Sequence, residues 1–144
     1  MPDDITTRAD IDALLRAFYA RAMTDAHIGY LFTEVAQLDL EAHLPRIGDF
    51  WEQVLLQRPV YVGNPMAVHI HLHGASPLKA THFQRWFELW AEAVDASFAG
   101  PIAMEAKRRA AIIAESMQAR LGIVSTEEAL GEAYRKALGL RGKT

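Results

Sequence analysis

The chain has 144 residues, 51% of them hydrophobic, and its 15 basic and 18 acidic residues give a formal charge of −3. This length predicts one globular domain, and the absence of cysteine excludes disulfides, thiolate metal sites, cofactors linked through C-x-x-C-H and cysteine nucleophiles. The mild negative charge argues against nucleic acid as a partner, and the acidic start without an apolar run predicts a soluble, cytoplasmic protein with no membrane segment.

Helical periodicity dominates from about residue 7 to residue 121. A first helix is predicted to begin near Thr7, because Thr7 and Asp10 stand at the spacing of a capping box. Tyr19 lies at the edge of the apolar stripe of this helix, which contains Ile11, Leu14, Leu15, Phe18 and Ala22. A short segment over residues 26–32 follows, where Gly29 disfavours a long helix.

The next predicted helix lies within residues 40–56. Its apolar face carries Leu40, His43, Ile47, Phe50, Trp51 and Val54. Because proline is tolerated only in the first turn, Pro45 leads us to expect an irregular turn and a regular helix that begins near His43. After a break over residues 57–63, Pro65 opens a short helical turn that carries Met66 and His69 and ends at Gly74 and Pro77.

Two long helices complete the predicted core. The first begins near Ala80, ends at Gly100, and has an aromatic face made of Phe83, Trp86, Phe87 and Trp90. Pro101 begins the second, Gly122 is its expected C-terminal cap, and its basic residues 107–109 are expected on a solvated face. A further amphipathic helix is predicted after Ser125 and Thr126. Since no long run alternates at period two, the chain is predicted to be all-α.

Four histidines, His69, His71, His73 and His82, are the candidates for metal chemistry. In a strand, the first three would share one face and could bind zinc or iron, whereas in a helix only His69 and His73 would share a face. The spacing leaves three interpretations open: a solvated loop, a haem ligand, or a site for a small metal ion.

The aromatic stripes also allow two interpretations. Such stripes are more often plain core than a cofactor site, and a lone histidine such as His43 on an apolar face is usually a core residue. Two tryptophan-bearing helices and a tyrosine at a stripe edge would nevertheless suit a large flat apolar ligand, and buried indole N–H groups need a hydrogen-bond partner.

Several segments match a known family in order and spacing. They are Phe18-Tyr19, His43 with Ile47-Gly48-Asp49-Phe50-Trp51, the string GNPMAVH over residues 63–69, and the string HFQRWFELW over residues 82–90. Over roughly residues 8–121, the chain resembles a truncated haemoglobin of group III.

The resemblance implies a two-over-two helical sandwich around one non-covalent haem b. It implies a globin domain over residues 1–122, with residues 123–144 as a C-terminal helical extension of unknown role. By matching positions, His69 is the proximal iron ligand, and Tyr19, His43 and Trp86 are the distal residues. The apolar wall of the haem pocket is expected to consist of Phe32, Ile47, Phe50, Trp51, Met66, Phe83 and Ile113.

The function that the resemblance implies is binding of dioxygen or another diatomic ligand at a five-coordinate iron, with oxygen transport as a further expectation. Two alternatives stay open: a haem enzyme acting on nitric oxide or peroxide, and a haem-free helical interaction or regulatory domain. The expected partners are the diatomic ligand and an unidentified reductase, and the expected state is a monomer or weak dimer. His73, four residues beyond His69, is a rival for the iron.

Overall fold

The structure is a computed structural model that describes residues 2–123, so the predicted helix after Ser125 lies outside the described residues. Five α-helices and one π-helix make up this part of the chain. They are α1 (Arg8–Ala22), the π-helix η1 (Leu31–Val35), α2 (Leu40–Leu56), α3 (Pro65–Ala75), α4 (Ala80–Ser97) and α5 (Pro101–Leu121). The described residues contain no strand, which confirms the all-α prediction.

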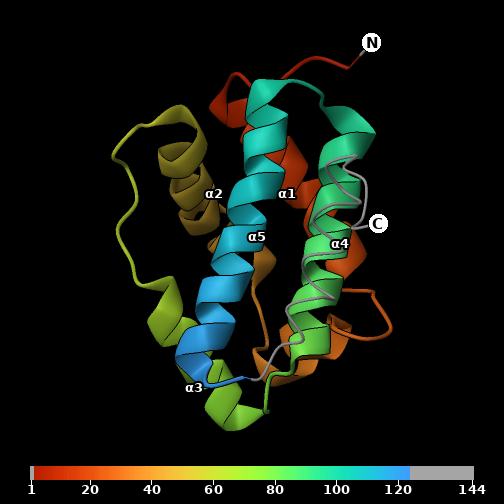
Figure 1. Ribbon diagram of the computed structural model, residues 1–144, viewed down its shortest axis with the longest axis vertical. Coiled ribbons are helices and arrows are strands. Elements are labelled where there is room, and N and C mark those ends of the chain that lie inside the picture. The colour runs from red at the N-terminus through yellow and green to blue at the C-terminus, as the bar shows by residue number, and fades with distance from the viewer. Residues whose placement is uncertain (1, 124–144) are drawn as a thin grey trace, which may run out of the picture.

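The helices form two packed pairs (Figure 1). Helix α1 packs against α2 and α4 packs against α5, while contacts of α1 with α4 and of α2 with α5 join the pairs. The core between them is dominated by large side chains, of which Trp90, Phe18 and Phe87 are almost completely buried. The architecture is therefore the predicted two-over-two sandwich.

Helix α1 begins as predicted. The Thr7 hydroxyl accepts a hydrogen bond from the Asp10 N–H at 3.2 Å, and the Asp10 carboxylate accepts one from the Thr7 N–H at 3.1 Å. This capping box satisfies N–H groups that the first helical turn cannot pair. The stripe Ile11, Leu14, Leu15, Phe18, Tyr19 and Ala22 is buried.

The predicted start of α2 is wrong. The helix begins at Leu40, where the Asp39 side chain caps it by accepting from the Ala42 N–H, and it continues through Pro45. Proline at this position cannot donate the hydrogen bond that another residue would make to the Glu41 carbonyl. The α-helix therefore spans a position at which the sequence predicted an irregular turn.

Helix α3 is the least buried helix of the structure. It begins at Pro65 behind an asparagine cap, in which the Asn64 side chain accepts from the Ala67 N–H at 3.1 Å, and it runs past Gly74 to Ala75. None of its residues is buried, and its contacts are mainly with α5. Among residues 2–123, one side of α3 therefore has no packed neighbour.

Two features of α5 differ in how well the sequence predicted them. Gly122, in the left-handed conformation, ends the helix as expected, and the Ile123 N–H donates to the Gln118 carbonyl at 2.9 Å. The expectation of a solvated face for Lys107 is wrong, because this side chain is 8% exposed and lies 2.7 Å from Asp95. A buried cation needs such a partner.

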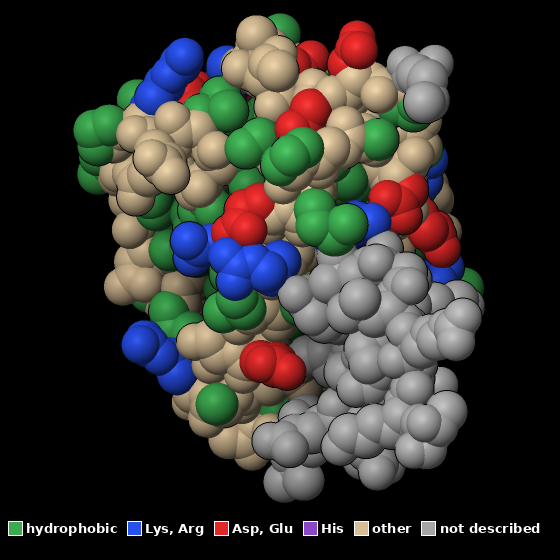
Figure 2. All heavy atoms as spheres, turned by 45° about the horizontal axis from the view of Figure 1, so that its top comes forward, with side chains coloured by type: hydrophobic (Ala, Val, Ile, Leu, Met, Phe, Trp, Pro, Cys, Tyr) green, Lys and Arg blue, Asp and Glu red, His purple; other side chains and the backbone are tan. Residues whose placement is uncertain are grey.

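Acidic and basic side chains are interspersed on the face drawn in Figure 2, with no field of one sign. This distribution agrees with the small net charge of the chain. Within residues 2–123, no helix is long and apolar enough to cross a membrane.

Candidate functional site

Helices α1 and α2 bring Tyr19 and His43 together. The Tyr19 hydroxyl lies 2.9 Å from Nε2 of His43. Burial raises the pKa of Tyr19, which therefore stays a neutral phenol. Burial also lowers the pKa of His43, and repulsion from Arg46 and His69 adds to this effect. Tyr19 and His43 therefore form a neutral phenol–imidazole pair, in which each side chain carries one polar hydrogen that it can donate.

Two aromatic rings hold the Tyr19 ring in place. Phe18 meets it edge-on with ring centroids 5.0 Å apart, and Phe32, from η1, meets it edge-on at 5.9 Å. Edge-to-face contacts of this kind favour one ring orientation. The short π-helix therefore contributes directly to the position of the phenol, as such irregular helices often do at functional sites.

Trp86 extends the same aromatic cluster from α4. Its indole stacks on Trp90 with centroids 6.2 Å apart, and Trp90 in turn stacks on Trp51 at 4.5 Å. The Trp90 N–H donates to the Ala106 carbonyl at 3.1 Å. The half-buried Trp86 indole N–H, by contrast, has no hydrogen-bond partner among residues 2–123.

His69 on α3 has one ring nitrogen occupied and one available. Its Nδ1 lies 2.7 Å from the Pro65 carbonyl oxygen, one helical turn earlier. Because a carbonyl can only accept, Nδ1 carries the proton and a neutral ring has its lone pair on Nε2. Repulsion from His69 contributes to the lowered pKa of His43, so the two imidazoles are close enough to interact across the site.

The remaining candidate histidines have other partners. Nδ1 of His73 accepts from the Leu78 N–H at 2.8 Å, and Nδ1 of His82 accepts from the Lys79 N–H at 3.0 Å. In a neutral ring these bonds place the proton on Nε2, which then cannot ligate a metal. His71 is exposed.

The structure contradicts the strand arrangement on which the predicted three-histidine metal site depended. Helical geometry in α3 separates the three histidines that a strand would have placed on one face. Within the described part of the chain, no group of three or more His, Cys, Asp or Glu side chains is placed to hold a metal ion.

The seven residues predicted for the apolar wall fall into two groups. Five are half-buried, namely Phe32, Ile47, Phe50, Met66 and Ile113, while Trp51 and Phe83 are buried among core residues. Of the half-buried residues, Phe32 contacts Tyr19, and Ile47 lies one helical turn after His43 on α2. Sequence reasoning missed Arg46, whose charge acts on His43, although its helical i, i+3 spacing from His43 was an available signal.

Comparison with known proteins places this geometry in a class. No protein-family model matches the chain. A curated group 3 truncated haemoglobin from Campylobacter jejuni is 25% identical over 121 residues, which are 82% of this chain and 93% of that protein. The crystal structure of a group III truncated haemoglobin from Campylobacter jejuni superposes with a TM-score of 0.73 at 25% identity, covering 84% of this chain and 95% of that one.

The fold is therefore that of a truncated globin. Within this class, sequence and structure both confirm the resemblance to the group III truncated haemoglobins that the motifs indicated.

Proposed function

We propose that the protein binds haem b without a covalent link, with His69 as the axial ligand of the iron. The observation that carries this proposal is the 2.7 Å contact between Nδ1 of His69 and the Pro65 carbonyl. This bond orients the ring and leaves the Nε2 lone pair available, which is how proteins prepare a histidine to bind a metal. The same test argues against His73, whose Nδ1 is an acceptor.

The residues around His69 suit a large apolar cofactor. Helix α3 buries none of its side chains, and five of the predicted wall residues are half-buried. The absence of cysteine excludes attachment of haem through thioether bonds. Haem, when bound, would supply an iron that can coordinate a diatomic ligand.

We further propose that Tyr19, His43 and Trp86 form the distal side and bind dioxygen or another polar diatomic ligand. If Nε2 of His43 donates to the Tyr19 oxygen, the phenolic hydrogen is left to donate to the ligand. Trp86 offers a second donor, since its N–H is unpaired within residues 2–123. A hydrogen bond to a strongly polar acceptor is worth about 1–3 kcal/mol, so two donors favour slow ligand release.

A haem titration with a matched pair of variants tests the proposal. We expect wild type to bind one equivalent of haem with a strong Soret band, and His69→Ala to lose the spectrum of a histidine-ligated iron. His73→Ala, one turn away on the same helix, is the control and should retain that spectrum. Absence of a stoichiometric Soret band in wild type would overturn the proposal, and loss of ligation in His73→Ala alone would overturn the ligand assignment.

A further inference from the structure

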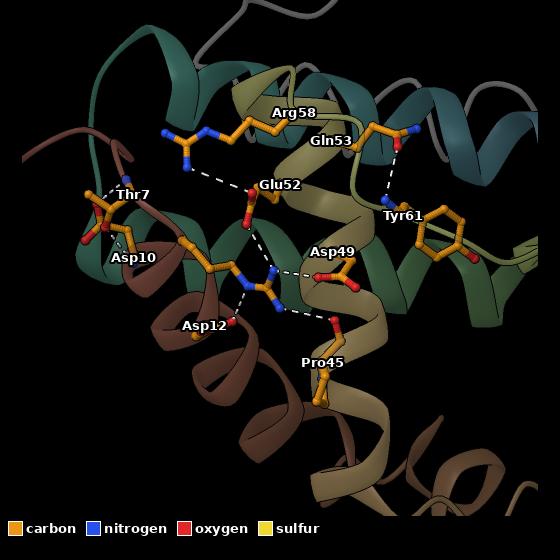
Figure 3. Close-up of polar contacts among 10 residues, drawn as sticks. Thr7, Asp10, Asp12, Pro45, Asp49, Glu52, Gln53, Arg58 and Tyr61 are labelled. Carbon is orange, nitrogen blue, oxygen red and sulfur yellow. Dashed lines mark hydrogen bonds and ion pairs between the residues drawn. The ribbon is translucent and has the colours of Figure 1, made fainter.

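The Arg8 guanidinium, at the start of α1, binds four oxygen atoms on two helices. It lies 2.9 Å from Asp12 on its own helix and, on α2, 2.7 Å from Asp49, 3.0 Å from Glu52 and 3.1 Å from the Pro45 carbonyl (Figure 3). Figure 3 shows these α2 groups converging on the guanidinium from successive turns of that helix. Charge-assisted hydrogen bonds of this kind are stronger than neutral ones and fix the geometry of both partners.

One of these contacts falls at the weakest point of α2. Pro45 cannot donate to the Glu41 carbonyl, and helices bend most easily where proline interrupts the hydrogen-bond ladder. His43 lies two residues before this point, in the first turns of the helix. Arg8 contacts α2 at the proline and on its far side, through Asp49 and Glu52. It therefore ties α2 to α1 immediately after the missing hydrogen bond between residues 41 and 45.

Gly48 provides the space for this arrangement. A Cβ atom at residue 48 would lie 2.5 Å from Nη2 and 2.8 Å from Cζ of Arg8. The atoms that it would meet belong to the end of a flexible side chain, so a methyl group would displace the guanidinium and leave the backbone in place. Gly48→Ala is consequently a second way to remove the Arg8 contacts without changing Arg8.

The Tyr19–His43 pair, which we call the distal pair, lies at the other end of the interface between α1 and α2. Tyr19 is eleven residues after Arg8, about three turns along the same side of α1, and its hydroxyl meets His43 on α2. We propose that Arg8 is a positioning residue, which holds α2 at its proline so that His43 stays in hydrogen-bonding distance of Tyr19. The effect of Arg8 on a bound diatomic ligand rests on the proposed function; its effect on the Tyr19–His43 bond does not.

A surface ion pair between the same helices provides the control. Arg16 lies 3.0 Å from Glu41, but their side chains are 58% and 73% exposed. Exposed pairs contribute little to geometry or stability. Arg16→Gln therefore removes a cation from α1 at an α2 contact and should leave the distal pair unchanged.

The direct test is the ring-nitrogen NMR spectrum of His43 in the full-length purified protein, reduced and saturated with carbon monoxide if haem is present. Tyr19→Phe defines the Nε2 shift expected when the hydrogen bond is lost. We expect Arg8→Gln and Gly48→Ala to move Nε2 most of the way to this value, Arg8→Lys to move it partly, and Arg16→Gln to leave it unchanged. Wild-type Nε2 shifts in folded Arg8→Gln or Gly48→Ala would overturn the proposal.

Two further measurements separate positioning from general destabilisation. In a Pro45→Ala background the ladder of α2 is complete, so Arg8→Gln should shift Nε2 much less; an undiminished shift would contradict the role of the proline. If Arg8→Gln does not fold, Gly48→Ala and Arg8→Lys decide the outcome.

The second measurement is the C–O stretching frequency of the protein with carbon monoxide bound. Loss of the distal hydrogen-bond donor should raise this frequency in Arg8→Gln, as it should in Tyr19→Phe. A missing Soret band would defeat the proposed function alone, because the NMR test needs no haem.

Discussion

The location of single protons distinguishes the histidines of this protein. His69, His73 and His82 all use Nδ1 in a hydrogen bond to the backbone, but only His69 meets a carbonyl, whereas the other two meet an N–H. A carbonyl forces the proton onto Nδ1, and an N–H forces it off. In a neutral ring, His69 therefore has a free lone pair on Nε2 for a metal, whereas His73 and His82 do not. The role of His69 as the iron ligand stays a prediction, and its chemical reason is the carbonyl that holds the proton on Nδ1.

At the same scale, Tyr19→Phe should weaken the hold on a bound diatomic ligand. Removal of the phenolic hydroxyl deletes a donor while the ring keeps its contacts with Phe18 and Phe32. A lost hydrogen bond of about 1–3 kcal/mol corresponds to roughly 5- to 150-fold faster dioxygen dissociation, with faster autoxidation. Stopped-flow ligand replacement measures this rate.

Tyr30→Phe is the matched control for this experiment. Tyr30 is exposed and its hydroxyl lies 3.3 Å from His82, so its loss should leave the dissociation rate unchanged. An unchanged rate in Tyr19→Phe would instead assign the working donor to Trp86 or His43.

At the scale of the helices, the residue that caps a helix is either a neighbour in the sequence or a residue far away in it. The caps of α1, α2 and α3 come from neighbouring residues, namely Thr7, Asp39 and Asn64. Helix α5 is capped from a distance, because Asp4 accepts from the Ile102 N–H at 3.0 Å and the Ala103 N–H at 2.8 Å, across 98 and 99 residues. Gly100, at φ +138°, leaves space for this carboxylate.

Asp4→Ala should therefore destabilise the fold by about 1–2 kcal/mol, because two N–H groups lose their acceptor and the positive end of α5 loses a negative charge. Urea unfolding measures the difference. Asp3→Ala is the control, since Asp3 accepts from the Ala99 N–H through its backbone carbonyl, which the substitution keeps. Equal midpoints for the two variants would show that the Asp4 carboxylate does not stabilise α5.

At the scale of the whole molecule, buried histidines should make the stability fall in acid. Burial lowers the pKa of His82, and repulsion from His27 and Lys79 adds to it. The folded protein then binds a proton less readily than the unfolded chain, whose histidine has the ordinary value of 6.5. The free energy of unfolding should be constant above that pH and decrease as the pH falls below it.

His82→Asn isolates this contribution. The Asn side-chain oxygen can accept from the Lys79 N–H as Nδ1 does, but it does not titrate. Urea unfolding between pH 7 and pH 5 should therefore show a smaller loss of stability than in wild type, with a residual slope from His43. A slope in His82→Asn equal to that of wild type would contradict the assignment to His82.

Much of the fold follows from local patterns that the sequence displays. The capping box of Thr7 and Asp10, the glycine cap at Gly122 and the apolar stripes of the long helices depend on residues a few positions apart, so their spacing predicts them. Ordered motifs such as residues 63–69 and 82–90 were enough to indicate the globin class. Local spacing misplaced the start of α2, because helix packing tolerates the single hydrogen bond that Pro45 loses.

By itself, then, the sequence determined the helical class, the order of the helices, and which residue types could serve a haem site without cysteine. Tertiary structure decided which histidine keeps a free lone pair, that Tyr19 meets His43, that Lys107 is buried against Asp95, and that Arg8 reaches α2 across 37 to 44 residues. The physical reason is the range of the interactions. Caps and stripes arise within a few turns of helix, whereas proton positions and buried charges depend on partners that only packing brings within 3 Å or so.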